Sequence, residues 1–419
     1  MSRRCDECFS RNHYIDDGMS NVIARPPLST LNAFVALVGG ERWKARLAGL
    51  GGPPASGWSG RALLQRHAIE LMIERLRRCR EAVPTTAERG IAALVADTVS
   101  LSRRIPAEAR QRLADTLAGA MLDGQTLVPF FHVMRTAALQ RARGFHVAFP
   151  GIEQGEVFDL LIERDGVEAE IACDVMSAEE GRDVHRGAWF RLVDRVDPEL
   201  QTWLAAHPGR YLLKMTLPQG LKSDRSPDDT SLASLHQRIS TLLSEHRRAD
   251  QDEAAVLRLD PLLLAAAQAE ERGLASHLRQ EFGPEAHLSV TSAGNGVFVM
   301  AARAGRENEI AVALRRRMGA IAPVRLSGTR PGILAMFIED TDRNEWRLLR
   351  DRLDLEGEAR QFLTNREARP VVAVTCSSRV ELFGIGQPDG AADGELRFRN
   401  PAHPAAKSAA LAAAVQSSS

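Results

Sequence analysis

Residues 157–175 read VFDLLIERDGVEAEIACDV, two largely apolar runs on either side of Asp165-Gly166. An Asp-Gly pair between two such runs is a strong signal for a tight β-hairpin, so we predict strands over 156–164 and 167–175. Successive side chains of a strand point to opposite faces. One face of the second strand therefore carries Glu168, Glu170, Ala172 and Asp174.

The segments around this hairpin extend the pattern. A helix over 126–143 and a strand over 144–149 are expected before it. A polar helix over 177–193, a short helix over 198–206 and a buried strand over 209–217 are expected after it. Beyond residue 218, helices and strands alternate, which indicates an α/β protein with a mixed or largely parallel sheet. The C-terminal strands either extend the first sheet or form a separate domain.

The order helix–strand–strand–strand–helix–strand over residues 126–217 resembles the core of the PD-(D/E)XK nuclease-like superfamily. The resemblance implies a restriction-endonuclease-like αβββαβ core, preceded by a helical N-terminal region and followed by further α/β elements. In that family an Asp opens the second strand and a Glu-x-Lys lies on the third. Two carboxylates hold Mg²⁺, which activates the attacking water, and the lysine supports the developing charge.

The match to this motif is partial. Asp159 resembles the metal-binding aspartate of the family, but Ala172 and Asp174 stand where the Glu and the Lys are expected. Glu170 and Asp174 share a strand face and remain candidates to bind Mg²⁺ together with Asp159. Arg182 and His185, with Arg186 next to them, are candidates to replace the missing lysine.

Each of these residues also has an interpretation without catalysis. Asp159 can be a polar residue at a strand end. Glu170 and Asp174 can form the solvent side of a half-buried strand, which needs a polar face in any case. Arg182 and His185 can belong to a solvated helix start. A fold-level resemblance does not establish an activity.

The region 56–125 is expected to be helical and rich in arginine. A solvated helix face is one interpretation of its arginines, and a phosphate-binding surface is the other, because the guanidinium fork suits phosphate. The candidate nucleic-acid contacts are Arg66, Arg75, Arg77, Arg78 and Arg80.

The whole chain has 419 residues and balances 54 basic against 54 acidic residues, which argues against a polybasic nucleic-acid coat. Its apolar runs are shorter than the ~20 residues of a membrane span. Its five cysteines are irregularly spaced, which favours reduced thiols over a disulfide framework. These features predict a cytoplasmic location and no membrane contact.

The two ends differ from the middle. Residues 1–55 are expected to be partly disordered, and Met19 is a candidate translation start. The pair Cys5 and Cys8, with His13 beyond, has the spacing of half a zinc knuckle, but no second pair completes four ligands. Residues 401–419 form an Ala/Ser-rich tail that we expect to be disordered. The region 218–400 is the expected C-terminal α/β part.

Three hypotheses for function follow. The first is a nuclease-like protein that is catalytically impaired and binds nucleic acid or a protein partner. The second is an active Mg²⁺-dependent endonuclease that uses Asp159, Glu170 and Asp174. The third is an interaction or scaffold protein with no nucleic-acid role.

Overall fold

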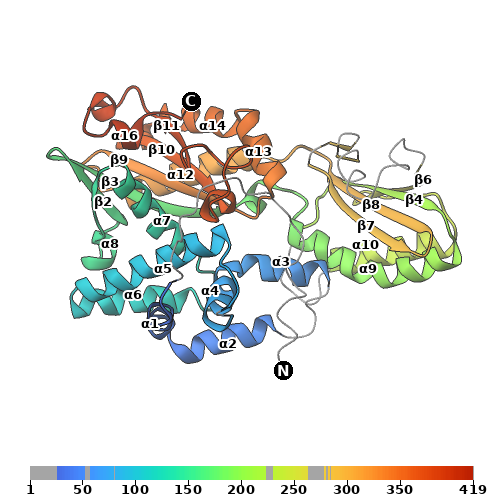
Figure 1. Ribbon diagram of the computed structural model, residues 1–419. Coiled ribbons are helices and arrows are strands. Elements are labelled where there is room, and N and C mark those ends of the chain that lie inside the picture. Colours follow the sequence, from blue (N-terminus) through green and yellow to red (C-terminus); the bar gives the residue numbers. More distant parts are fainter. Residues whose placement is uncertain are drawn as a thin grey trace.

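A computed structural model gives the arrangement of the chain (Figure 1). It describes residues 26–51, 57–79, 81–222, 230–262, 278–279, 282–283 and 285–418. Cys5, Cys8, His13, Met19 and Arg80 lie outside these ranges. The α/β class with mixed sheets is confirmed. The described chain consists of a helical N-terminal region and two separate sheets with their helices.

In its described residues, the N-terminal region is built from six helices. The apolar spacing of residues 29–48 and of residues 60–82 favours one long helix in each range. Gly39, whose φ of 100° is unfavourable for other residues, interrupts the first helix, and His67 interrupts the second. Thr85 and Glu88 form a capping box at the start of the fifth helix. The helices are α1 (Leu28–Val38), α2 (Gly40–Leu50), α3 (Trp58–Arg66), α4 (Ala68–Arg78), α5 (Thr86–Arg104) and α6 (Ala107–Gly119).

The first sheet has six strands in the order β1-β2-β3-β9-β10-β11. Strand β3 runs parallel to β9 and β9 runs parallel to β10, whereas the other neighbouring pairs are antiparallel. The strands are β1 (His146–Ala148), β2 (Leu160–Arg164), β3 (Val167–Ser177), β9 (Gly332–Glu339), β10 (Val371–Ser378) and β11 (Leu396–Arg399).

Helices cover both faces of this sheet (Figure 1). Phe131 of α7 packs in one apolar cluster with Ile171 of β3 and with side chains of the N-terminal helices. On the other face, Leu314 of α12 and Phe362 of α14 pack in a second cluster with Ala172. The helices of this unit are α7 (Val128–Ala142), α8 (Pro150–Glu153), α12 (Ile310–Arg325), α13 (Arg343–Asp351), α14 (Asp354–Leu363), α15 (Arg379–Leu382) and α16 (Ala412–Val415).

The second sheet belongs to an inserted unit between β3 and α12. Its five strands follow the order β5-β6-β4-β8-β7. The elements of the unit are α9 (Arg186–Ala206), β4 (Arg210–Leu217), α10 (Thr230–Ser244), β5 (Ala249–Gln251), β6 (Val256–Pro261), β7 (His287–Ala293) and β8 (Gly296–Ala304). Figure 1 shows this unit beside the first sheet.

The position of β4 corrects the expected core. The sequence places the strand over 209–217 next to the hairpin, but β4 pairs with β6 and β8 in the second sheet. Strand β9 lies beside β3 instead, with Glu170 opposite Gly332 and Ser177 opposite Glu339. The expected sixth element of the core is therefore supplied from more than 100 residues further along the chain.

The entry and the exit of the inserted unit meet at one point. The Glu309 amide donates to the Gly181 carbonyl at 2.7 Å. A Cβ on Gly181 would lie 2.4 Å from the Cα of Ile310, so a side chain has no room there. The contact closes the base of the insertion, which leaves the order of the first sheet undisturbed.

Three local predictions are wrong. The helix expected over 177–193 is a 3₁₀ turn (Ala178–Gly181) followed by α9, which continues through Pro198 to Ala206. The apolar run over residues 380–385 favours a strand, but the chain forms the short helix α15 (Arg379–Leu382) there. The tail expected to be disordered forms η4 (Pro404–Lys407) and α16, whose Val415 is buried against the first sheet's cluster.

Candidate functional site

The hairpin that decides the fold also holds the candidate metal ligands. Asp165 and Gly166 both adopt positive φ, as the predicted turn requires. Leu160 lies opposite Ile171 in the register, so Asp159 enters β2 beside Ala172. The acidic side chains of β3 share the face that is covered by α12.

Ala172 is completely buried in the apolar cluster between the sheet and α12. It occupies the position at which the resemblance expects a glutamate. Alternation brings it to the same face as Met176, which is also buried there. Packed apolar side chains therefore fill the space that a metal-binding carboxylate would need.

Asp159 is paired with an arginine. Its Oδ2 accepts from the Cys173 amide at 2.7 Å and from Arg325 Nη2 at 2.7 Å. Burial raises the pKa of Asp159, and the Arg325 charge opposes that rise. The carboxylate thus joins the start of β2 to β3 and to the end of α12.

Asp174 has a second arginine. Arg317 of α12 contacts both of its carboxylate oxygens, with Nε at 2.6 Å and Nη2 at 3.0 Å. This bidentate geometry gives the strongest form of an arginine–carboxylate pair. The bond to Asp174 raises the pKa of Arg317. A positive charge lies near the position where the resemblance expects a lysine. It belongs to Arg317 of α12, and the strand position itself holds Asp174.

Glu170 is fully buried, so its interpretation as the solvent side of the strand is wrong. It accepts from the Ser327 amide at 2.9 Å, from Ser327 Oγ and from Arg330 Nη1 at 3.4 Å. Arg330 Nε also contacts Glu168 at 2.7 Å. The residues after α12 therefore satisfy both oxygens of the Glu170 carboxylate.

The sequence alone does not identify the arginines that face the hairpin. Arg317, Arg325 and Arg330 lie at least 140 residues from their partners in the chain. Nothing in their local pattern separates them from the other arginines of the chain. The signal available was indirect, since a strand with three acids on a covered face needs cations opposite.

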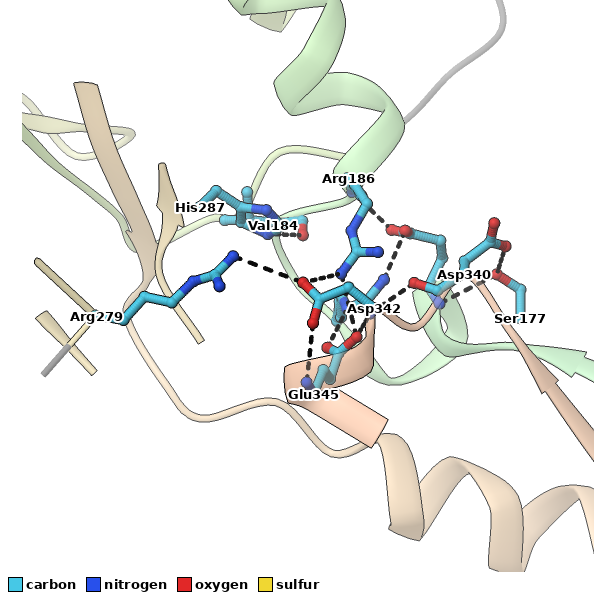
Figure 2. Close-up of polar contacts among 10 residues, drawn as sticks. Ser177, Val184, Arg186, Arg279, His287, Asp340, Asp342 and Glu345 are labelled. Carbon is cyan, nitrogen blue, oxygen red and sulfur yellow. Dashed lines mark hydrogen bonds and ion pairs between the residues drawn. The ribbon is translucent and has the colours of Figure 1, made fainter. Parts of the chain in front are cut away.

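The structure does not bring Arg182 and His185 to this face. Arg182 lies beyond the end of β3, where it pairs with Glu179 at 2.7 Å and with Glu345 of α13. It also donates to the Asp340 carbonyl at 2.9 Å. Figure 2 shows the polar cluster around these contacts, with Arg186 and Asp342 at its centre. Arg182 holds the base of the inserted unit against α13.

Within the described residues, no group of three or more His, Cys, Asp or Glu side chains is arranged to hold a metal ion. The geometry explains why Asp159, Glu170 and Asp174 do not fit Mg²⁺ as a set. Each faces an arginine, and Ala172 fills the remaining ligand position. Mg²⁺ prefers carboxylate and water oxygens in a near-octahedral shell, which the three guanidinium groups would block.

Comparison with known proteins adds no relative. No family model, curated protein or solved structure matches the chain.

The arginines of the N-terminal helices are also engaged within the chain. Arg75 contacts the buried Glu88, and Arg77 and Arg78 both contact Glu74. Arg66 donates to the Gly124 carbonyl at 2.9 Å. A phosphate would have to compete with these partners.

In the described part of the chain, no helix combines the length and the apolar character of a membrane span.

Proposed function

We propose that the chain is a nuclease-like protein that has lost cleavage and acts by binding. The observation that carries the proposal is the pairing of Asp159, Glu170 and Asp174 with arginines of α12 and of the loop that follows it. Carboxylates that are held by guanidinium groups stabilise the packing of a helix on a sheet. They are not available to a metal ion unless the arginines move away.

The order of elements supports the nuclease-like part of the proposal. Apart from the four-residue helix α8 between β1 and β2, helix α7, strands β1, β2 and β3, helix α12 and strand β9 follow the order helix–strand–strand–strand–helix–strand. This order holds when the inserted unit, whose two ends meet at Gly181 and Glu309, is left out of the sequence of elements. The hairpin thus keeps its place next to a parallel strand, while the residues that the family uses for chemistry are changed or paired.

We also propose that nucleic acid binds to the N-terminal helices only weakly. Arg75 is paired with Glu88, and Arg77 and Arg78 share Glu74, so the net positive charge of this surface is lower than the arginine content suggests. Contacts to phosphate would then be weak and would be lost as salt rises. The alternative binding partner is a protein, because the neutral net charge of the chain does not favour a nucleic acid.

Metal binding and cleavage test the proposal directly. Mn²⁺ is titrated calorimetrically into metal-stripped protein, and the same samples are incubated with plasmid DNA, single-stranded DNA and RNA. The variants are Asp159→Asn and, as a matched control, Asp165→Asn in the exposed hairpin turn. We expect no saturable Mn²⁺ binding and no cleavage in any of the three proteins.

The opposite result would establish the active endonuclease. It requires stoichiometric Mn²⁺ binding and cleavage in the wild type and in Asp165→Asn, both lost in Asp159→Asn. DNA and RNA binding measured over a salt series then decides between the two kinds of partner, because phosphate contacts weaken steeply with salt.

A further inference from the structure

A groove with a volume of about 840 Å³ lies between α1, α2 and α4 of the N-terminal region. These helices are neighbours in the fold (Figure 1). The Trp43 indole of α2 donates to Glu74 of α4 at 3.0 Å, and Arg77 of α4 donates to Asn32 of α1 at 3.1 Å. The residues that line the groove belong to these three helices, so its occupancy does not depend on the proposed loss of cleavage at the hairpin.

The floor of the groove is apolar. Leu28 at the start of α1 is 41% exposed, and Leu47 of α2 and Leu71 of α4 are half-buried. Leu28 and Leu71 belong to none of the apolar clusters that the described residues form. Leucines that share one hollow and stay in contact with water are typical of a binding surface, because an occupant would remove their apolar area from water.

One rim of the groove carries more positive than negative charge. Arg77 and Arg78 contact the same carboxylate, Glu74, at 2.6 and 2.5 Å, so two cations share one acid. The Arg78 side chain is 74% exposed and is open to a second acid. Lys44 of α2 contacts Glu41 and adds no net charge. The lining therefore suits an occupant with an apolar face and a small negative charge.

The chain itself carries a segment of this character. Residues 14–25 precede the described part of the chain and read YIDDGMSNVIAR, with Asp16 and Asp17 against a single Arg25. The apolar residues of the segment follow the spacing i, i+4, i+7 and i+8, which is the spacing by which amphipathic segments place apolar anchors in a groove. These anchors are Ile15, Met19, Val22 and Ile23.

The position of this segment in the chain favours it over other occupants. Ile23 stands five residues before Leu28, and five extended residues span at most about 17 Å. The groove runs along α4 from Leu71 to Arg78, which is about 10 Å of helix. A segment on so short a tether has an effective concentration on the order of millimolar. A second copy of the chain or a free partner would have to compete with that concentration.

We propose that the groove between α1, α2 and α4 is a peptide-binding site and that residues 15–25 of the same chain occupy it. The apolar anchors of the segment cover the leucines of the floor, and its acidic pair lies towards Arg77 and Arg78. The segment thereby withholds this surface from other partners, and a partner that binds there has to displace it first.

The test uses the full chain and a fluorescently labelled synthetic peptide with the sequence of residues 14–25. The double variant Val22→Asp/Ile23→Asp should vacate the groove, because a charged side chain is unfavourable against an apolar floor. Binding of the peptide is measured by fluorescence anisotropy. We expect the peptide to bind to the double variant and to bind at least about tenfold more weakly to the wild type, whose own segment competes.

One further substitution locates the bound peptide. Leu28→Asp, added to the double variant, should weaken peptide binding about tenfold, because it removes apolar area from the floor. It is compatible with folding, since Leu28 is half-exposed and an acid is favourable in the first turn of a helix. The matched control is Leu122→Asp, which changes a leucine that is 63% exposed outside the groove and should leave the affinity unchanged.

A second peptide tests the rim. It carries Asn in place of Asp16 and Asp17 and should bind about threefold more weakly than the first peptide at low salt, because exposed ion pairs contribute little and are screened as salt rises. At high salt the two peptides should bind equally.

Four results would overturn the proposal. The first is the absence of peptide binding to the double variant at millimolar concentration. The second is equal binding to the double variant and to the wild type. The third is binding that Leu28→Asp does not weaken or that Leu122→Asp weakens as much. The fourth is a wild-type dimer, detected by light scattering, that Leu28→Asp dissociates, because the occupant of the groove would then be a second copy.

Discussion

Replacing Arg317 by Gln should destabilise the protein more than replacing its partner Asp174 by Asn. The Asp174 side chain is 10% exposed, whereas that of Arg317 is 40% exposed. Loss of the arginine leaves a nearly buried carboxylate without a cation, which costs about 2–3 kcal/mol. Loss of the carboxylate leaves an arginine that water can reach, so the cost is about 1 kcal/mol.

A double-mutant cycle isolates the pair. The single variants and the double variant Asp174→Asn/Arg317→Gln are unfolded in urea, with tryptophan fluorescence and circular dichroism as the two probes. We expect a coupling free energy of about 1–2 kcal/mol, since the two groups make a bidentate contact. The control cycle is Glu168 with Arg330, whose side chains are 42% and 40% exposed, and its coupling should be below about 0.5 kcal/mol.

The result also distinguishes a structural pair from a metal site. If the carboxylates of β3 were ligands held apart for a cation, Arg317→Gln would leave stability in EDTA nearly unchanged and would create Mn²⁺ binding. A coupling free energy near zero together with new Mn²⁺ binding would refute the reasoning. A larger cost for Asp174→Asn than for Arg317→Gln would refute the asymmetry.

Three further predictions concern the core and the tail. Ala172→Glu should cost about 3 kcal/mol or more of unfolding free energy without creating Mn²⁺ binding, because the residue is completely buried in an apolar cluster; urea unfolding and calorimetry check this. Burial lowers the pKa of His132 from 6.5 to about 4, so the folded state resists a proton that the unfolded chain accepts. Stability conferred by the neutral imidazole is full above pH 6.5 and should fall by about 1.4 kcal/mol per pH unit between pH 6.5 and about 4, a slope that His132→Gln should reduce in urea titrations at stepped pH. Leu411→Asp should lower unfolding free energy by about 3 kcal/mol and make the last residues sensitive to protease, because Leu411 is fully buried against the first sheet; unchanged protease resistance would contradict the packing of the tail.

The wrong prediction of disorder for residues 401–419 has a physical cause. Residues 401–419 have the composition of a disordered segment, and the five alanines within residues 409–414 bury little area each. The apolar anchors Leu411 and Val415 nevertheless lie four residues apart and reach one face of a helical turn. A cluster already present on the sheet accepts them. Local composition carries no information about such a receiving surface.

The sequence by itself determined the elements that depend on neighbours along the chain. The alternation of 157–175 and the Asp165-Gly166 turn specify the hairpin, since the period of two and the positive φ values are local properties. The capping residues Thr85 and Glu88 specify the start of α5 for the same reason. That Ala172 stands where the resemblance expects a carboxylate also follows from the sequence alone.

Only the tertiary structure decided what surrounds the hairpin. Strands β4 and β9 are both apolar and strand-like, and their sequences do not state which of them pairs with β3. The closure of the inserted unit at Gly181 and Glu309 accompanies the pairing of β9 with β3. It brings α12 over the acidic face of β3, where Arg317 meets Asp174 across 143 positions of sequence. The partner of a charge is fixed by long-range packing, and in this chain that partner determines whether the carboxylates bind a metal or a helix.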